Sequence, residues 1–153
     1  MKRLNILAVT LLLLLASTAS AQTSRDHWSW KEKAVKDKPQ RQFTLSFQRR
    51  GNKVSGTYSV DQFINGEWQG EDGNQTPFIG TVRNGVINVE FDPLATVPGY
   101  QQNVKYTQPS DGRTPTKATI KIERNILTWT ILEGEKIEDL PDKLKLTRIK
   151  VHH

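Results

Sequence analysis

The sequence predicts an all-β protein in which about eight antiparallel strands close into an up-and-down β-barrel. Three observations lead to this fold class. Apolar and polar residues alternate with a period of two in one run after another, short turn signals separate the runs, and no amphipathic helix is long enough to cross between parallel strands. A closed barrel removes the exposed edges of an open sheet, and a two-sheet β-sandwich is the alternative.

The predicted strands share apolar side chains at alternate positions and end at Gly, Asn or Pro turn signals. In chain order they occupy residues 43–48, 54–64, 67–69, 78–82, 87–91, 118–122, 127–131 and 144–146, and part of a long loop, 102–106, forms a further edge strand. Asn65-Gly66 and Asn84-Gly85 are the residue pairs that tight two-residue hairpins prefer. Most connections are therefore short, as a meander requires.

The residues before the first of these strands divide into two segments. Residues 1–21 read as a cleaved signal peptide, because Lys2 and Arg3 precede an apolar run and Ala19-Ser20-Ala21 provides a small-residue cleavage site. The run is about 13 residues long, short of the ~20 that span a bilayer. Residues 22–41 are expected to form a lid or N-terminal extension, residues 42–149 the barrel domain and residues 150–153 a tail.

The absence of cysteine and the excess of basic residues indicate where the protein acts and what kind of partner it binds. The chain has no cysteine and a formal net charge of +6, with basic residues crowded into 25–50 and 143–150. An exported domain without disulfides suits the bacterial periplasm, or secretion from a bacterium. The basic clusters favour a protein or an anionic cell-envelope component as partner, and nothing in the chain resembles a nucleic-acid-binding motif or a membrane span.

Two regions are candidates for contact with a partner. The segment before the barrel carries Trp28 and Trp30, one of which is expected to close an end of the barrel. The alternative is an exposed pair that binds a partner, because tryptophan is enriched at binding hot spots. The stretch 93–115 breaks the strand rhythm, and a long irregular connection in a compact domain is usually functional. Within it Tyr100, Gln101, Gln102 and Tyr106 combine apolar area with adaptable hydrogen-bonding groups.

The interior is expected to be filled by side chains. The inward positions hold Phe43, Leu45, Phe47, Val54, Tyr58, Phe78, Val82, Ile87, Val89, Phe91, Ile120, Ile122, Leu127, Trp129, Ile131, Leu144 and Leu146. Gly56 and Gly80 are the exceptions and could leave a modest cavity. In that alternative the protein carries one small apolar ligand in this cavity, and Tyr58 and Trp129 line the cavity.

Catalysis finds little support in the residue pattern. The histidines stand at His27, His152 and His153, away from any strand interior, and neither G-x-S-x-G nor H-E-x-x-H occurs. The paired carboxylates Glu90 and Asp92 are available for acid–base work but read as solvated strand edges. We therefore expect no enzyme activity, no metal and no cofactor.

Short motifs in the strands resemble those of calycin barrels, the group that includes lipocalin and avidin-type proteins. The stretch V-S-G-T-Y at 54–58 is similar to their second strand, and residues 78–91 and 127–131 are similar to their middle strands. The resemblance implies a small secreted bacterial barrel. Because 30–42 lacks the Asn, Gly and Ser that hold biotin in avidin-type proteins, no ligand residues are carried over.

Taken together, these observations predict a non-enzymatic exported barrel that binds its partner through loops. In class it is similar to the small envelope barrels that inhibit lysozymes or neutralise toxins, so an inhibitor-like role is included in this expectation.

Overall fold

The computed structural model describes residues 25–64, 66–70, 74–99, 105–137 and 140–149. The predicted signal peptide and the tail at 150–153 lie outside these residues. Every regular element in the described part is a β-strand, and it contains no helix that could span a membrane. The all-β prediction is confirmed.

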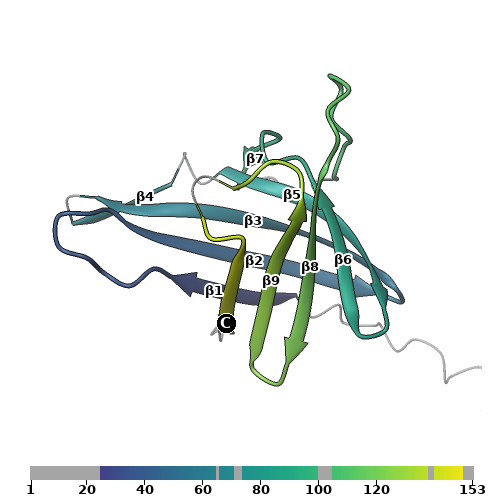
Figure 1. Cartoon of the computed structure of the whole chain (residues 1–153), viewed down its shortest axis with the longest axis horizontal. Coiled ribbons are helices and arrows are strands. Elements are labelled where there is room, and N and C mark those ends of the chain that lie inside the picture. Colours follow the sequence, from purple (N-terminus) through teal and green to yellow (C-terminus); the bar gives the residue numbers. More distant parts are fainter. Residues whose placement is uncertain (1–24, 65, 71–73, 100–104, 138–139, 150–153) are drawn as a thin grey trace, which may run out of the picture.

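The strands, in chain order, are β1 (Asp26–Lys31), β2 (Gln40–Arg50), β3 (Lys53–Ile64), β4 (Glu67–Gly70), β5 (Asn74–Arg83), β6 (Val86–Phe91), β7 (Val97–Pro98), β8 (Thr116–Glu123), β9 (Ile126–Glu133) and β10 (Lys143–Arg148). Eight of them form a closed antiparallel ring in the order β3-β2-β1-β10-β9-β8-β6-β5, and β5 pairs back to β3 (Figure 1). The short strands β4 and β7 add to β3 and β5 outside the ring. The ring decides the fold in favour of the barrel over the sandwich.

The segment before residue 42 differs from the expected lid. β1 is a ring strand that pairs with β2 on one side and β10 on the other, so that Trp28 lies opposite both Leu45 and Arg148. Its sequence, Asp-His-Trp-Ser-Trp-Lys, alternates with a period of two, and the ring needs one more strand to join β2 to β10. This polar segment is therefore a strand because it pairs with β2 and β10 and so closes the sheet. The first strand of the barrel begins at Asp26.

Only residues 105–106 of the edge strand expected near 102–106 are described, and they are not in a strand, while 102–104 lie outside the described residues. In the described part of this connection the short strand is β7. β7 pairs with the beginning of β5, where Asn74 lies opposite Pro98. Proline is tolerated at this position because β7 is an outer strand, where the backbone N–H that proline lacks is not needed to pair with another strand.

The two ends of the barrel differ in the length of their connections. Short turns at 50–53, 83–86 and 123–126 lie at one end, which we call the turn end, together with the beginning of β1 and the end of β10. At the turn 83–86, Asn84 and Gly85 have φ angles of 50° and 76°, as a type I′ turn requires. The long connections 91–116 and 133–143 lie at the opposite end, which we call the mouth, and the 105–115 excursion rises above it in Figure 1. The connection 31–40 is at the same end of its strands, but Figure 1 shows it at the far left beside β4, away from that excursion.

The centre of the core is the indole of Trp129 on β9, which is fully buried. Its ring lies 5.6 Å from Phe43, 6.1 Å from Tyr58, 6.3 Å from Phe78 and 5.5 Å from Phe91, between ring centroids. These partners come from β2, β3, β5 and β6. One side chain therefore packs against four other strands of the ring, and the contacts leave the middle of the barrel filled.

Side chains also close the interior near both ends. At the turn end Trp28 is buried, and the guanidinium carbon of Arg148 lies 5.4 Å from the centroid of its ring. At the mouth Ile137 and Leu140, from the connection between β9 and β10, are each only 4% exposed. Most expected core residues are buried, but Ile122 is exposed and Val82 and Ile131 are half-buried, because they lie toward the strand ends.

Gly56 does not open a cavity. A Cβ atom built on it would lie 2.7 Å from Phe47 Cβ and 2.7 Å from Phe78 Cζ, and it would also collide with the backbone oxygen of Ser46. The glycine lets these phenyl groups approach the backbone closely, which is a common reason for glycine in a strand. The expectation of free space at this position is wrong.

We predict that Gly56→Ala lowers the free energy of unfolding by about 1–3 kcal/mol or more, because the new methyl group overpacks the core. Ser55→Ala, at the neighbouring position whose side chain faces outward, is the control and should change stability by less than about 0.5 kcal/mol. Urea unfolding followed by tryptophan fluorescence measures both. Equal stability of G56A and the parent would show that this part of the core has spare room.

Candidate functional site

The mouth of the barrel is the candidate site, because its loops are long and fixed by specific side-chain contacts. β6 ends at Asp92, which is 5% exposed despite its charge. One carboxylate oxygen of Asp92 accepts a hydrogen bond from the backbone N–H of Leu94 at 3.0 Å. This contact turns the chain sharply away from the strand and places Leu94 at the rim.

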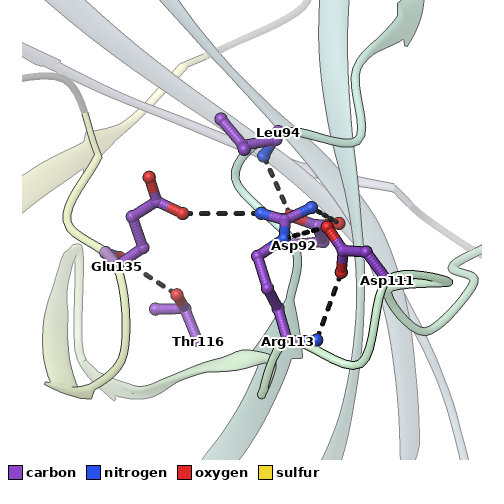
Figure 2. Close-up of polar contacts among 6 residues, drawn as sticks. All are labelled: Asp92, Leu94, Asp111, Arg113, Thr116 and Glu135. Carbon is purple, nitrogen blue, oxygen red and sulfur yellow. Dashed lines mark hydrogen bonds and ion pairs between the residues drawn. The ribbon is translucent and has the colours of Figure 1, made fainter.

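The guanidinium group of Arg113 joins the connections at the mouth (Figure 2). It donates to both carboxylate oxygens of Asp92 at 3.3 Å and to Asp111 at 2.5 Å. It also lies 3.5 Å from a carboxylate oxygen of Glu135, which belongs to the connection between β9 and β10. Hydrogen bonding from Arg113 lowers the pKa of the Asp111 carboxyl. Arg113 therefore fixes both ends of 92–113 and ties this segment to Glu135.

A second set of contacts holds the connection between β9 and β10 in place. The hydroxyl of Thr116 donates to the backbone oxygen of Glu135 at 3.0 Å. Gly134 packs so closely on Thr116 that a Cβ atom there would lie 2.7 Å from its Cα, and its φ angle of 99° also favours glycine. These contacts keep Ile137 seated in the barrel as a plug.

Between the loops the mouth forms a hollow of about 430 Å³. Its wall comprises Tyr58, Ser59, Val60, Asn74, Thr76, Pro93, Leu94, Thr96, Glu135, Lys136 and Ile137. Tyr58 and Ile137 contribute buried apolar surface to it, and Leu94, 63% exposed, stands at its edge. Hydroxyl, amide and charged groups surround this apolar part, a composition typical of a recognition site.

The third connection at the mouth, between β1 and β2, is fixed by Glu32 and Arg41. The guanidinium group donates to both carboxylate oxygens of Glu32, at 2.9 and 2.6 Å. Glu32 and Arg41 are also joined through the backbone, since Glu32 N–H donates to the oxygen of Arg41 at 2.8 Å. The side-chain hydrogen bond from Arg41 lowers the pKa of the Glu32 carboxyl.

The partner-binding residues expected from the sequence have different surroundings. Tyr100, Gln101 and Gln102 lie outside the described residues. Tyr106 is half-buried, and its hydroxyl is buried without a hydrogen-bond partner in the described part of the chain. Burial, together with the nearby charges of Glu90 and Asp92, raises the pKa of the Tyr106 hydroxyl.

The two tryptophans do not form an exposed pair. Trp28 is buried inside the ring, so it cannot contact a partner at the surface. Trp30 is half-buried and packs against the core from the mouth side of β1. The structure therefore assigns Trp28 to the core, against its expected role in binding.

The residues expected to line an internal ligand site do not share one cavity: Tyr58 borders the hollow at the mouth, whereas Trp129 and Gly56 are enclosed by packed side chains. Tyr58 and Trp129 are buried against other aromatic rings, and Gly56 is in close contact with Phe47 and Phe78. Gly80 lies beside a larger hollow of about 590 Å³, but that hollow is on the outer wall. Its side chains, such as Ser55, Ile79 and Asn88, alternate with the buried ones along their strands.

The candidate acid–base carboxylates have separate environments. Asp92 is held by Arg113, whereas Glu90 lines the hollow on the outer wall. Within the described ranges, no group of three or more His, Cys, Asp or Glu side chains is placed to hold a metal ion. The mouth thus combines ion pairs with a hollow that apolar side chains partly line.

Sequence reasoning identified the 93–115 loop but missed the residues that organise it. Leu94, Arg113 and Glu135 lie in irregular segments, where no periodicity relates them. The available signal was the pair Asp92-Pro93, because Asp before a turn commonly bonds the backbone N–H two residues on. The ion pair between Asp92 and Arg113 could not be predicted in this way, because it depends on how the loop returns to β8.

Comparison with known proteins adds no assignment. No protein-family model matches the chain, and no curated protein shows significant similarity to it.

We predict that Arg113→Gln lowers the urea midpoint of unfolding, because the buried carboxylate of Asp92 loses its charged partner. Asp92→Asn should also destabilise, and the double variant should lose less than the two single variants together, since both remove the same interaction. Lys117→Gln is the control, because its exposed pair with Glu133 should contribute little. If the two single effects simply added, the ion pair between Arg113 and Asp92 would not be what stabilises the mouth.

Proposed function

We propose that this protein is a non-catalytic, exported binding protein that takes a protein partner at the mouth of the barrel, as an inhibitor would. One observation carries the proposal: an apolar residue, Leu94, is held exposed beside a shaped hollow by the fixed contacts of Asp92 and Arg113. Leu94 is 63% exposed, so most of its side chain is available for contact with a partner. Held in one position, it can enter a pocket of a partner without a large ordering cost.

The surroundings of Leu94 support a protein partner. The wall of the hollow includes apolar side chains such as Val60, Leu94 and Ile137, and Glu135, Lys136 and Asn74 add charge and amide groups. An apolar centre with a polar rim is the usual anatomy of a protein interface. The filled barrel below supports the loops rigidly, because Ile137 is seated in the core.

A second candidate function, carriage of a small apolar ligand, is favoured by the size of the hollow. About 430 Å³ lies within the range of small-molecule sites, and Tyr58 is part of its wall. Such a ligand would lie at the mouth, above the aromatic core. Deeper entry would need displacement of Ile137 and Leu140 from the interior.

We predict that Leu94→Ser weakens binding of the partner about tenfold or more, the loss typical of an apolar interface anchor. Leu132→Ser is the matched control, because Leu132 is 62% exposed, compared with 63% for Leu94, but lies on the outer wall. The partner is identified by placing a photo-crosslinking residue at position 94 or at 132 in protein made in its own cells. Crosslinking from 132 in place of 94 would move the site to the wall.

The carrier function predicts a different result. Native mass spectrometry of the protein, isolated gently from its own cells, should then show an added mass of a few hundred daltons, and Ile137→Ala should change the affinity for that ligand. The protein-binding function predicts an unloaded monomer and a crosslinked protein at position 94. A bound ligand without any crosslink at 94 would favour the carrier.

A further inference from the structure

The turn end of the barrel carries a large excess of basic side chains. All of them are exposed, and they are Arg25, Arg49, Arg50, Lys53, Arg83, Lys121, Arg124 and Arg148. They come from segments far apart in the sequence, and closure of the ring brings their strand ends together (Figure 1). The acidic residues in the described part of this end are Asp26 and Glu123.

These two acidic residues are each engaged by one basic residue. Asp26 pairs with Arg148, and Glu123 pairs with Lys121 at 2.6 Å. The other six basic side chains of the turn end form no salt bridge with described residues. At the mouth, by contrast, the guanidinium group of Arg113 meets the carboxylates of Asp92, Asp111 and Glu135. With eight basic and two acidic side chains in its described part, the turn end carries a net positive charge.

Exposed isoleucines lie among these charges. Ile122 is 39% exposed, Ile126 47% and Ile149 42%. Ile126 lies opposite Thr147, two residues before Ile149, so these two side chains are near each other on the outer face of the sheet. Ile122 lies opposite Leu127, at the end of the inward face of β8. The turn end therefore presents apolar side chains together with its basic ones, a combination that suits a partner with both anionic and apolar groups.

The turn between β8 and β9 presents one of the arginines at a conformational cost. Arg124 has a φ angle of 58°, in the left-handed region that side chains other than Gly and Asn seldom adopt. The equivalent position of the turn between β5 and β6 holds Asn84, a residue type that adopts a positive φ angle readily. An arginine at the tip places a long cationic side chain beyond the end of the barrel.

We propose that the turn end docks on an anionic lipid surface. Its arginine and lysine side chains would contact lipid phosphates, and Ile122, Ile126 and Ile149 would enter the boundary between head groups and acyl chains. A soluble polyanion could neutralise the charge but would leave the isoleucines in water, which is why a lipid surface is the better occupant. The mouth, at the opposite end, would then face away from the membrane, and the two sites are independent.

Vesicle flotation tests this proposal with phosphatidylglycerol–phosphatidylcholine vesicles (1:1) and vesicles of phosphatidylcholine alone. The parent protein should float with the anionic vesicles and release at high salt. Arg50→Gln, Lys53→Gln and Arg83→Gln together should reduce this binding on the order of 100-fold, at roughly a factor of five for each charge. The control, Lys33→Gln, Lys36→Gln and Lys38→Gln, removes the same charge at the mouth and should change binding less than about threefold.

A second pair of variants separates a lipid surface from other anions. Ile126→Ser with Ile149→Ser should weaken vesicle binding but leave retention on a soluble polyanion, heparin, unchanged. Circular dichroism and urea midpoints confirm that all variants fold. Equal losses for the turn-end and mouth variants, or full vesicle binding by the isoleucine variant, would overturn the proposal.

Discussion

The packing of Trp129 against rings from four other strands is the contact on which the rest of the barrel depends. Each aromatic side chain removes a large apolar area from water, and their tilted arrangement adds favourable ring–ring contacts. The same cluster fixes the strand register, since a shift by one residue would turn Phe43 or Tyr58 toward solvent. Because the centre is filled, neither a ligand nor a water-filled channel is needed to hold the ring open.

A filled centre separates the two ends of the molecule. The turn end can be short and rigid, because its strands are joined by tight turns that contain Gly51 or Asn84-Gly85. The mouth instead carries long connections whose backbone is fixed by side chains, above all by Arg113 and Arg41. Recognition of a protein at the mouth and contact with an anionic surface at the turn end are therefore compatible in one small domain.

The course of the mouth loops shows why charge is distributed unevenly. Loops that leave the sheet need replacement hydrogen bonds for their backbone and for buried carboxylates such as Asp92. Arginine supplies several donors in one plane, so ion pairs accumulate where the loops are long. The turn end needs no such contacts, because a two-residue turn forms its backbone hydrogen bonds within the hairpin. Its basic side chains are therefore not used to fix loops.

The sequence by itself determined the strand pairs, most of the core and two of the tight turns. These features are local: alternation with a period of two selects the buried face, and Asn84-Gly85 suits positive φ angles at consecutive positions. The resemblance to calycin barrels is compatible with the ring, but no family match supports a closer assignment. Only the tertiary structure decided that the polar segment at Asp26–Lys31 is a ring strand, that Ile137 and Leu140 close the mouth, and that Phe47 and Phe78 occupy the space beside Gly56. Each of these depends on a neighbour distant in the chain, and alternation within one segment carries no information about such neighbours.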